Sequence, residues 1–73
     1  MRIRYDKDDD ILTIDQGMPG DTIDHAEEVG SMITHFTADG RAVLFEVLDA
    51  TDFLSAAIRA ITARTAGEEI DVR

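Results

Sequence analysis

Residues 32–48 read MITHFTADGRAVLFEVL and decide the fold of this 73-residue chain. The Asp39-Gly40 pair separates two segments rich in β-branched and aromatic residues, and Asp-Gly in that position is the strongest short-range signal for a β-hairpin. A two-residue turn would align these partners on one face: Phe36 with Val43, Thr34 with Phe45, and Met32 with Val47. The stretch therefore predicts two antiparallel strands, 32–37 and 42–48, that share an apolar face. Its predicted buried positions are Phe36, Val43, Phe45 and Val47.

A second hairpin is predicted at the N-terminus, with strands at residues 2–5 and 11–15 joined by a charged, solvated loop. Apolar and polar residues alternate in both segments, which is typical of strands with one buried face. One register sorts both faces at once, and its partners are Ile3 with Ile14, Tyr5 with Leu12, Arg4 with Thr13, and Arg2 with Asp15. This agreement of both faces favours the hairpin.

A third, more polar strand is predicted at residues 22–29, after a loop that contains two glycines and the only proline of the chain. Gly30-Ser31 is a candidate tight turn into the strand that begins at Met32. A turn centred there pairs Val29 with Met32 and His25 with Phe36, and it keeps the apolar residues on one face.

Helix signals begin after Leu48, and the predicted helix spans residues 52–65. Its apolar residues recur at three- and four-residue spacing and form one stripe: Leu54, Ala57, Ile58 and Ile61. Three residues are capable N-caps, namely Asp49, Thr51 and Asp52, and Gly67 suits the C′ position. The predicted fold is therefore α+β: one domain over residues 1–73, with an antiparallel β-meander of five short strands, one C-terminal amphipathic helix and a short tail at 66–73.

Composition limits the classes of function. Sixteen Asp and Glu against seven Lys and Arg give a formal charge of −9, which argues against a nucleic-acid binder and suits a basic protein partner. There is no cysteine, and thus no disulfide or thiolate site. No run of residues has the length of a membrane span, and Met1-Arg2-Ile3-Arg4 lacks a signal-peptide core, so we expect a cytoplasmic protein. Because a chain this short buries little core, we also expect a homodimer.

Two groups of residues resemble metal sites. Asp6, Asp8 and Asp10 imitate the first ligands of a calcium loop, but Ile11 stands where a glycine must turn and Gly17 where a bidentate Glu belongs. His25 and His35 would be a metal pair only in a register that the apolar residues disfavour. The sequence therefore predicts no bound metal and no cofactor.

Catalysis is not expected, because a general acid or base requires a desolvated pocket, and a small sheet with one helix offers little concavity. The outer face of the last two strands is more informative. Ile33, Leu44 and Leu48 lie there on adjacent strands and form a candidate dimer or partner interface. The alternative is that the helix folds over this face.

Several motifs within residues 1–50 resemble one known family: Ile3-x-Tyr5-Asp6, Asp10-x-Leu12-x-Ile14, Glu27-Glu28-Val29, Asp39-Gly40-Arg41 and the run from Val43 to Ala50. The chain is similar in these motifs to domain of unknown function 2283, a family of small bacterial proteins. The resemblance assigns no activity and no catalytic residue. It implies an antitoxin-like role as one version of its function, because some members are encoded beside small toxin-like proteins.

The function predicted from the sequence is thus a non-enzymatic protein-interaction module that self-associates. In the antitoxin-like version, its acidic surface would shield the basic groove of a partner protein. The alternative is a small-molecule or metal-binding domain that uses His25, His35 and nearby carboxylates.

Overall fold

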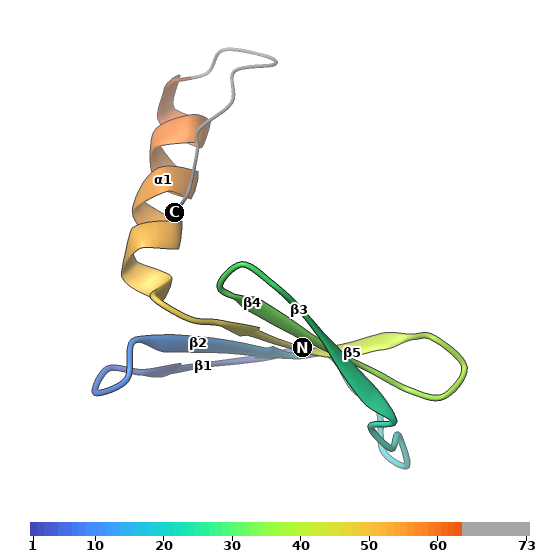
Figure 1. Cartoon of the computed structure of the whole chain (residues 1–73). Helices are drawn as coiled ribbons and strands as arrows, with labels where there is room; N and C mark the ends of the chain where they lie inside the picture. The colour runs from blue at the N-terminus through green and yellow to red at the C-terminus, as the bar shows by residue number, and fades with distance from the viewer. Residues whose placement is uncertain (64–73) are drawn as a thin grey trace.

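The computed structural model describes residues 1–63 as one antiparallel five-stranded sheet followed by one helix (Figure 1). In chain order the elements are β1 (Arg2–Asp6), β2 (Ile11–Asp15), β3 (His25–Val29), β4 (Met32–Phe36), β5 (Ala42–Val47) and α1 (Ala50–Ala63). The α+β class predicted from the sequence is confirmed. The third strand is the element whose bounds differ most, because it begins at His25 and not at residue 22.

Both hairpins outside the Asp39-Gly40 turn have the predicted register. In β1 and β2, Ile3 lies opposite Ile14 and Tyr5 lies opposite Leu12. In β3 and β4, the partners are Val29 with Met32 and His25 with Phe36, around a turn in which Gly30 has a φ of 58°. Period-two patterning was sufficient here because a shift by one residue would move the apolar side chains of each hairpin to the opposite face.

The β4–β5 hairpin departs from the predicted register at its turn. Met32 lies opposite Val47 and Thr34 opposite Phe45 as predicted, but Phe36 lies opposite Ala42 and not Val43. The register shifts between His35 and Phe36, so Val43 is the extra residue of a bulge on β5. The loop is also longer than two residues, since the Gly40 N–H donates to the Thr37 carbonyl oxygen at 3.0 Å.

The strands are ordered β1-β2-β5-β4-β3 across the sheet, so β5 is the central strand. The predicted meander holds within each hairpin and along β3-β4-β5, but it breaks between β2 and β3, because β2 pairs with β5. This pairing sets Leu12 against Val47 and Ile14 against Phe45. The more polar third strand is left at the edge, where fewer of its side chains are buried.

Helix α1 starts at Ala50, two residues earlier than predicted, and follows β5 after a sharp corner. Asp49 forms the corner with a φ of 50°, and its carbonyl oxygen accepts a hydrogen bond from the Asp52 N–H at 3.2 Å. Asp49 therefore precedes the helix as one predicted cap residue, whereas Thr51 and Asp52 lie inside it. The predicted helix end at residue 65, the predicted C′ residue Gly67 and the tail 66–73 lie outside the described residues.

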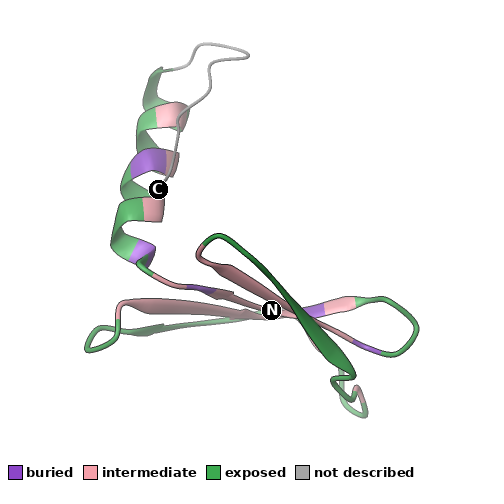
Figure 2. Ribbon diagram, viewed as in Figure 1, coloured by how far each residue is buried: buried purple, intermediate pink, exposed green. Residues whose placement is uncertain are grey.

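Little of the described chain is buried. Among residues 1–63 the buried hydrophobic residues are Val43, Val47, Ala50 and Ala56. Burial of Val43 and Val47 was predicted and is confirmed, but Phe36 and Phe45 are only half-buried. Figure 2 shows half-buried inner strands between the exposed edge strands β1 and β3. Phe36 and Phe45 stay partly exposed because no second layer within residues 1–63 covers their face of the sheet.

Candidate interaction surface

One face of the sheet is apolar from edge to edge. The strand registers place ten residues on this face, which we call the apolar face: Ile3, Tyr5, Leu12, Ile14, Val29, Met32, Thr34, Phe36, Phe45 and Val47. His25 and Glu27 complete it on β3. A sheet face of this composition normally packs against another layer of the protein.

The apolar face is open to solvent, most strongly at its two edges. Ile3 and Tyr5 on β1 are 62% and 48% exposed, and Val29 on β3 is 78% exposed. The side chains between these edges are half-buried by their neighbours in the sheet, and Val47 is the buried member of the set. Monomeric soluble proteins rarely expose large contiguous apolar patches, so this face is the candidate interaction surface.

Helix α1 touches the apolar face only at its base. Phe53 lines a hollow together with Val29, Met32 and Val47, which puts the start of the helix on the apolar side of the sheet. From there α1 rises away from the strands (Figure 1). Its outward side carries three exposed apolar residues, which we call the helix stripe: Leu54 (38% exposed), Ile58 (62%) and Ile61 (77%). No helix within residues 1–63 has the length and apolar character needed to span a bilayer.

The angle between the helix and the sheet is held by Asp10, at the end of the β1–β2 loop. The Asp10 carboxylate accepts hydrogen bonds from the Thr51 N–H at 3.1 Å, the Thr51 hydroxyl at 2.7 Å and the Tyr5 hydroxyl at 2.7 Å. The Asp10 carbonyl oxygen also accepts from the Ala50 N–H at 3.0 Å. Two N–H groups that every helix leaves unpaired at its start are thus satisfied by a residue far away in sequence.

These contacts favour the charged form of Asp10. Hydrogen bonds from Thr51 first, and then from Tyr5, lower the pKa of the Asp10 carboxyl below its ordinary value. From the sequence, Asp10 was one of three solvated carboxylates in an imitation calcium loop. The structure assigns it to the helix N-terminus instead. No local pattern reveals this, because Asp10 and Thr51 are 41 positions apart.

The opposite face of the sheet is more polar and contains two side-chain pairs. At one end the Arg2 guanidinium donates to the Asp15 carboxylate at 2.8 Å. Near the centre His35 Nε2 lies 2.6 Å from Glu46 Oε1, with both side chains partly buried. We call this side the polar face.

The candidate interface residues Ile33, Leu44 and Leu48 do not gather into one patch. Ile33 lies opposite Glu46, and Leu44 lies opposite His35, so the His35–Glu46 pair runs between the two aliphatic side chains. Leu48 lies beyond β5 and lines the hollow near Phe53. All three are half-buried. The helix does not cover Ile33 and Leu44 either, because its base lies on the apolar side.

The two histidines lie on opposite faces, since His25 is in register with Phe36 and His35 with Ala26. His25 stacks on the Phe36 ring, with centroids 5.2 Å apart, and its Nδ1 lies 2.9 Å from the Asp24 carboxylate. The His–His site considered from the sequence is therefore not assembled. Within residues 1–63 no three His, Asp or Glu side chains converge as a metal site would require.

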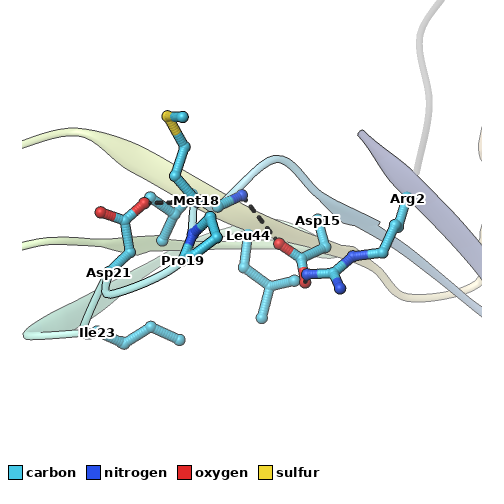
Figure 3. Close-up of a pocket in the computed structure, with 9 residues that line it drawn as sticks. Arg2, Asp15, Met18, Pro19, Asp21, Ile23 and Leu44 are labelled. Atoms are coloured by element: carbon cyan, nitrogen blue, oxygen red, sulfur yellow. Dashed lines mark hydrogen bonds and ion pairs between the residues drawn. The ribbon is translucent and has the colours of Figure 1, made fainter.

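A hollow of about 380 Å³ opens beside the loop after β2 (Figure 3). Its two carboxylates already have partners within the chain. Asp15 accepts from Arg2 and from the Gly17 N–H at 2.9 Å. Asp21 accepts from the Met18 N–H at 2.8 Å and from Arg41 at 2.6 Å. The guanidinium of Arg41 lowers the pKa of Asp21, so these groups tie the loop to the β4–β5 turn.

Comparison with known proteins gives a family and no activity. No curated protein and no solved structure matches the chain. A family model described as a protein of unknown function, DUF2283, matches residues 2–50, which contain all five strands and end at the first residue of α1. Since this match spans well over half of the chain, the protein belongs to the DUF2283 family.

Proposed function

We propose that this domain is a protein-interaction module that self-associates through its apolar face. The observation that carries the proposal is the combination of composition and exposure on that face: twelve positions, nine of them hydrophobic, with no layer of described chain packed over them. Burying apolar surface contributes about 25 cal/mol for each Å² removed from water, so a self-complementary contact here stabilises both partners.

The polar face supports the proposal by contrast. Arg2 pairs there with Asp15, and His35 pairs with Glu46. A partner that covered this side would have to desolvate paired charges, and the return in Coulomb energy often fails to offset that cost. These pairs support an interface on the apolar face, and Ile33, Leu44 and Leu48 remain the alternative location.

Light scattering on the wild type at micromolar concentration tests self-association, with a dimer expected. Ile3→Glu puts a charge at the exposed edge of the apolar face and is expected to give a monomer. Arg4→Glu is the matched control, because it changes the next residue of the same strand on the opposite face and adds even more negative charge. It is expected to remain dimeric.

Two results would contradict the proposal. A monomeric wild type, with a melting temperature that does not rise with protein concentration, would remove self-association altogether. Leu44→Asp is expected to separate the chains only if the contact lies on the polar face. Dissociation by Leu44→Asp but not by Ile3→Glu would move the interface to that face.

A further inference from the structure

We propose that helix α1 of a second copy is the element that covers the apolar face, so that two chains exchange helices around a two-fold axis. The inference rests on the proposed function and identifies the partner surface. In this dimer, the helix stripe of each chain packs on the apolar face of its partner. Such an arrangement is closed, because both contacts are satisfied within the pair.

The first support is that α1 is held away from its own sheet. Asp10 binds the first turn of the helix through Thr51 and Ala50, and the chain enters that turn at Asp49 with a φ of 50°. The helix begins only three residues after β5 ends at Val47, so there is no linker that would let it swing back over the strands. Held in this way, α1 leaves its stripe exposed and accessible to another molecule.

The second support is the match in length between the two surfaces. Helix α1 has 14 residues, which corresponds to about 21 Å at 1.5 Å per residue. Strands of five or six residues are about 17–20 Å long at 3.3 Å per residue. A helix of this length therefore spans the strands of a partner sheet with little overhang.

The third support is the exposure of large apolar side chains within the described residues. The apolar face exposes Ile3, Tyr5 and Val29 at its edges, and the helix stripe exposes Leu54, Ile58 and Ile61, each by 38–78%. A stable protein–protein interface buries about 1,200–2,000 Å² counted over both partners, which requires apolar surface of this kind on each chain.

The fourth support is the distribution of charge. Two chains of formal charge −9 repel each other unless their contact surfaces avoid the acidic groups. Helix α1 carries one acidic and one basic residue, Asp52 and Arg59, and the apolar face carries one carboxylate, Glu27. The two surfaces that exchange in the proposed dimer are therefore the ones with the least charge.

A complementation experiment on the full chain tests this arrangement. The helix variant carries Ile58→Glu and Ile61→Glu, and the sheet variant carries Ile3→Glu and Val29→Glu. Each variant alone is expected to dimerise at least tenfold more weakly than wild type. Mixed together, they are expected to form a heterodimer, because the wild-type helix of one chain meets the wild-type sheet face of the other. Sedimentation velocity with one variant fluorescently labelled measures this directly.

The matched control for the helix variant carries Ser55→Glu and Arg59→Glu, two exposed positions of α1 outside the stripe. It is expected to dimerise within about twofold of wild type, since surface substitutions away from a contact have small effects. Far-UV circular dichroism checks that each variant is folded. If a Glu variant is unfolded, Ser at the same positions replaces it in the experiment.

The possible results separate the two proposals. A monomeric wild type overturns both self-association and helix exchange. A helix α1 that folds over its own sheet would give this result. A helix variant that dimerises like wild type overturns helix exchange and leaves association through the apolar face in place. Helix exchange is also overturned if each variant dimerises weakly and the mixture forms no heterodimer. That result would indicate that the helix substitutions and the sheet substitutions disrupt the same contact.

Discussion

The two faces of the sheet are built from the same five strands but differ in how far the chain completes them. On the polar face, two pairs of polar side chains meet across neighbouring strands, namely Arg2–Asp15 and His35–Glu46. On the apolar face, aliphatic and aromatic residues meet across the same strands, but nothing described covers them, and Ile3 stays 62% exposed. Alternation along a strand is enough to pair charges, whereas burying an apolar face requires a second layer.

The two faces also differ in how much their side chains contribute to the stability of the fold. Ion pairs near a surface contribute about 0–1 kcal/mol each, so the polar face is complete but adds little stability. Burial of a Val, Leu, Ile or Phe side chain contributes about 1.5–3 kcal/mol, so most of the stability still available to this chain lies on the apolar face. Substitutions on the two faces should therefore have effects of very different size.

The largest effect is expected for Val47→Asp, at the buried centre of the apolar face, where Val47 is 3% exposed. An unpaired charge at a buried position costs about 3–5 kcal/mol, which is a large part of the stability of a domain this small. The variant is expected to be largely unfolded at room temperature. Urea denaturation followed by circular dichroism measures the change.

Val47→Thr is the control for shape, because it keeps the branched side chain and adds one hydroxyl. It is expected to remain folded and to lose about 1–3 kcal/mol. If Val47→Asp had the same urea midpoint as wild type, the centre of the apolar face would not be packed, and the contrast between the two faces would be lost.

An intermediate effect is expected for Asp10→Asn, which tests the corner that keeps the apolar face uncovered. Asn tolerates the φ of 54° at this position and keeps an acceptor oxygen, but it loses the negative charge at the start of α1. The urea midpoint at neutral pH is expected to fall. Asp8→Asn is the control from the same loop, where the Asp8 N–H and not its carboxylate makes the hydrogen bond to Asp6; its midpoint should stay close to wild type.

The same variant should change the response to acid. Because the folded state lowers the Asp10 pKa from 3.8, the contribution of Asp10 is present above about pH 4 and is lost as the pH falls through the lower folded value. Wild type should therefore lose stability below about pH 4, and Asp10→Asn should lose less over that window. The pKa values of Asp15 and Asp21 are also lowered in the folded state. Both proteins should therefore still lose some stability as the pH falls. Identical acid profiles would contradict the role given to Asp10.

The smallest effect is expected for Glu46→Gln, on the polar face next to Val47. The substitution keeps the size of the side chain and removes its charge, and it weakens a partly exposed pair with His35 that contributes about 0.5 kcal/mol. The change in the free energy of unfolding from urea titration should be of that order. A loss as large as that of Val47→Thr would mean that the polar face also carries much of the stability.

Much of the sheet was predictable because its signals are local. Alternation in residues 2–5 and 11–15 predicts the register of Ile3 with Ile14, and Gly30-Ser31 predicts the turn that sets Val29 against Met32. In both cases a shift by one residue would move apolar side chains to the polar side, so few registers compete. The amphipathic pattern likewise predicts α1 to within two residues at its start.

The features that escaped prediction depend on contacts between distant segments. The bulge at Val43 and the pairing of β2 with β5 both involve β5, which meets strands on its two sides. A bulge is hardly visible in the sequence pattern, since it changes the register at one residue and leaves the partners of Met32 and Thr34 unchanged. The candidate interface at Ile33, Leu44 and Leu48 was reasoned from alternation alone, which does not reveal that His35 and Glu46 pair between two of its members.

By itself the sequence determined which segments form strands and helix, which side of each strand is apolar and how the β1–β2 and β3–β4 hairpins pair, because spacing and turn chemistry act over a few residues. Only the tertiary structure decided that β5 is central, that Asp10 binds the start of α1 and that the helix leaves the apolar face open. These features depend on which distant groups meet once the strands have paired. Local pattern carries no information about the distance between Asp10 and Thr51, and their hydrogen bonds form only after the sheet has brought them together.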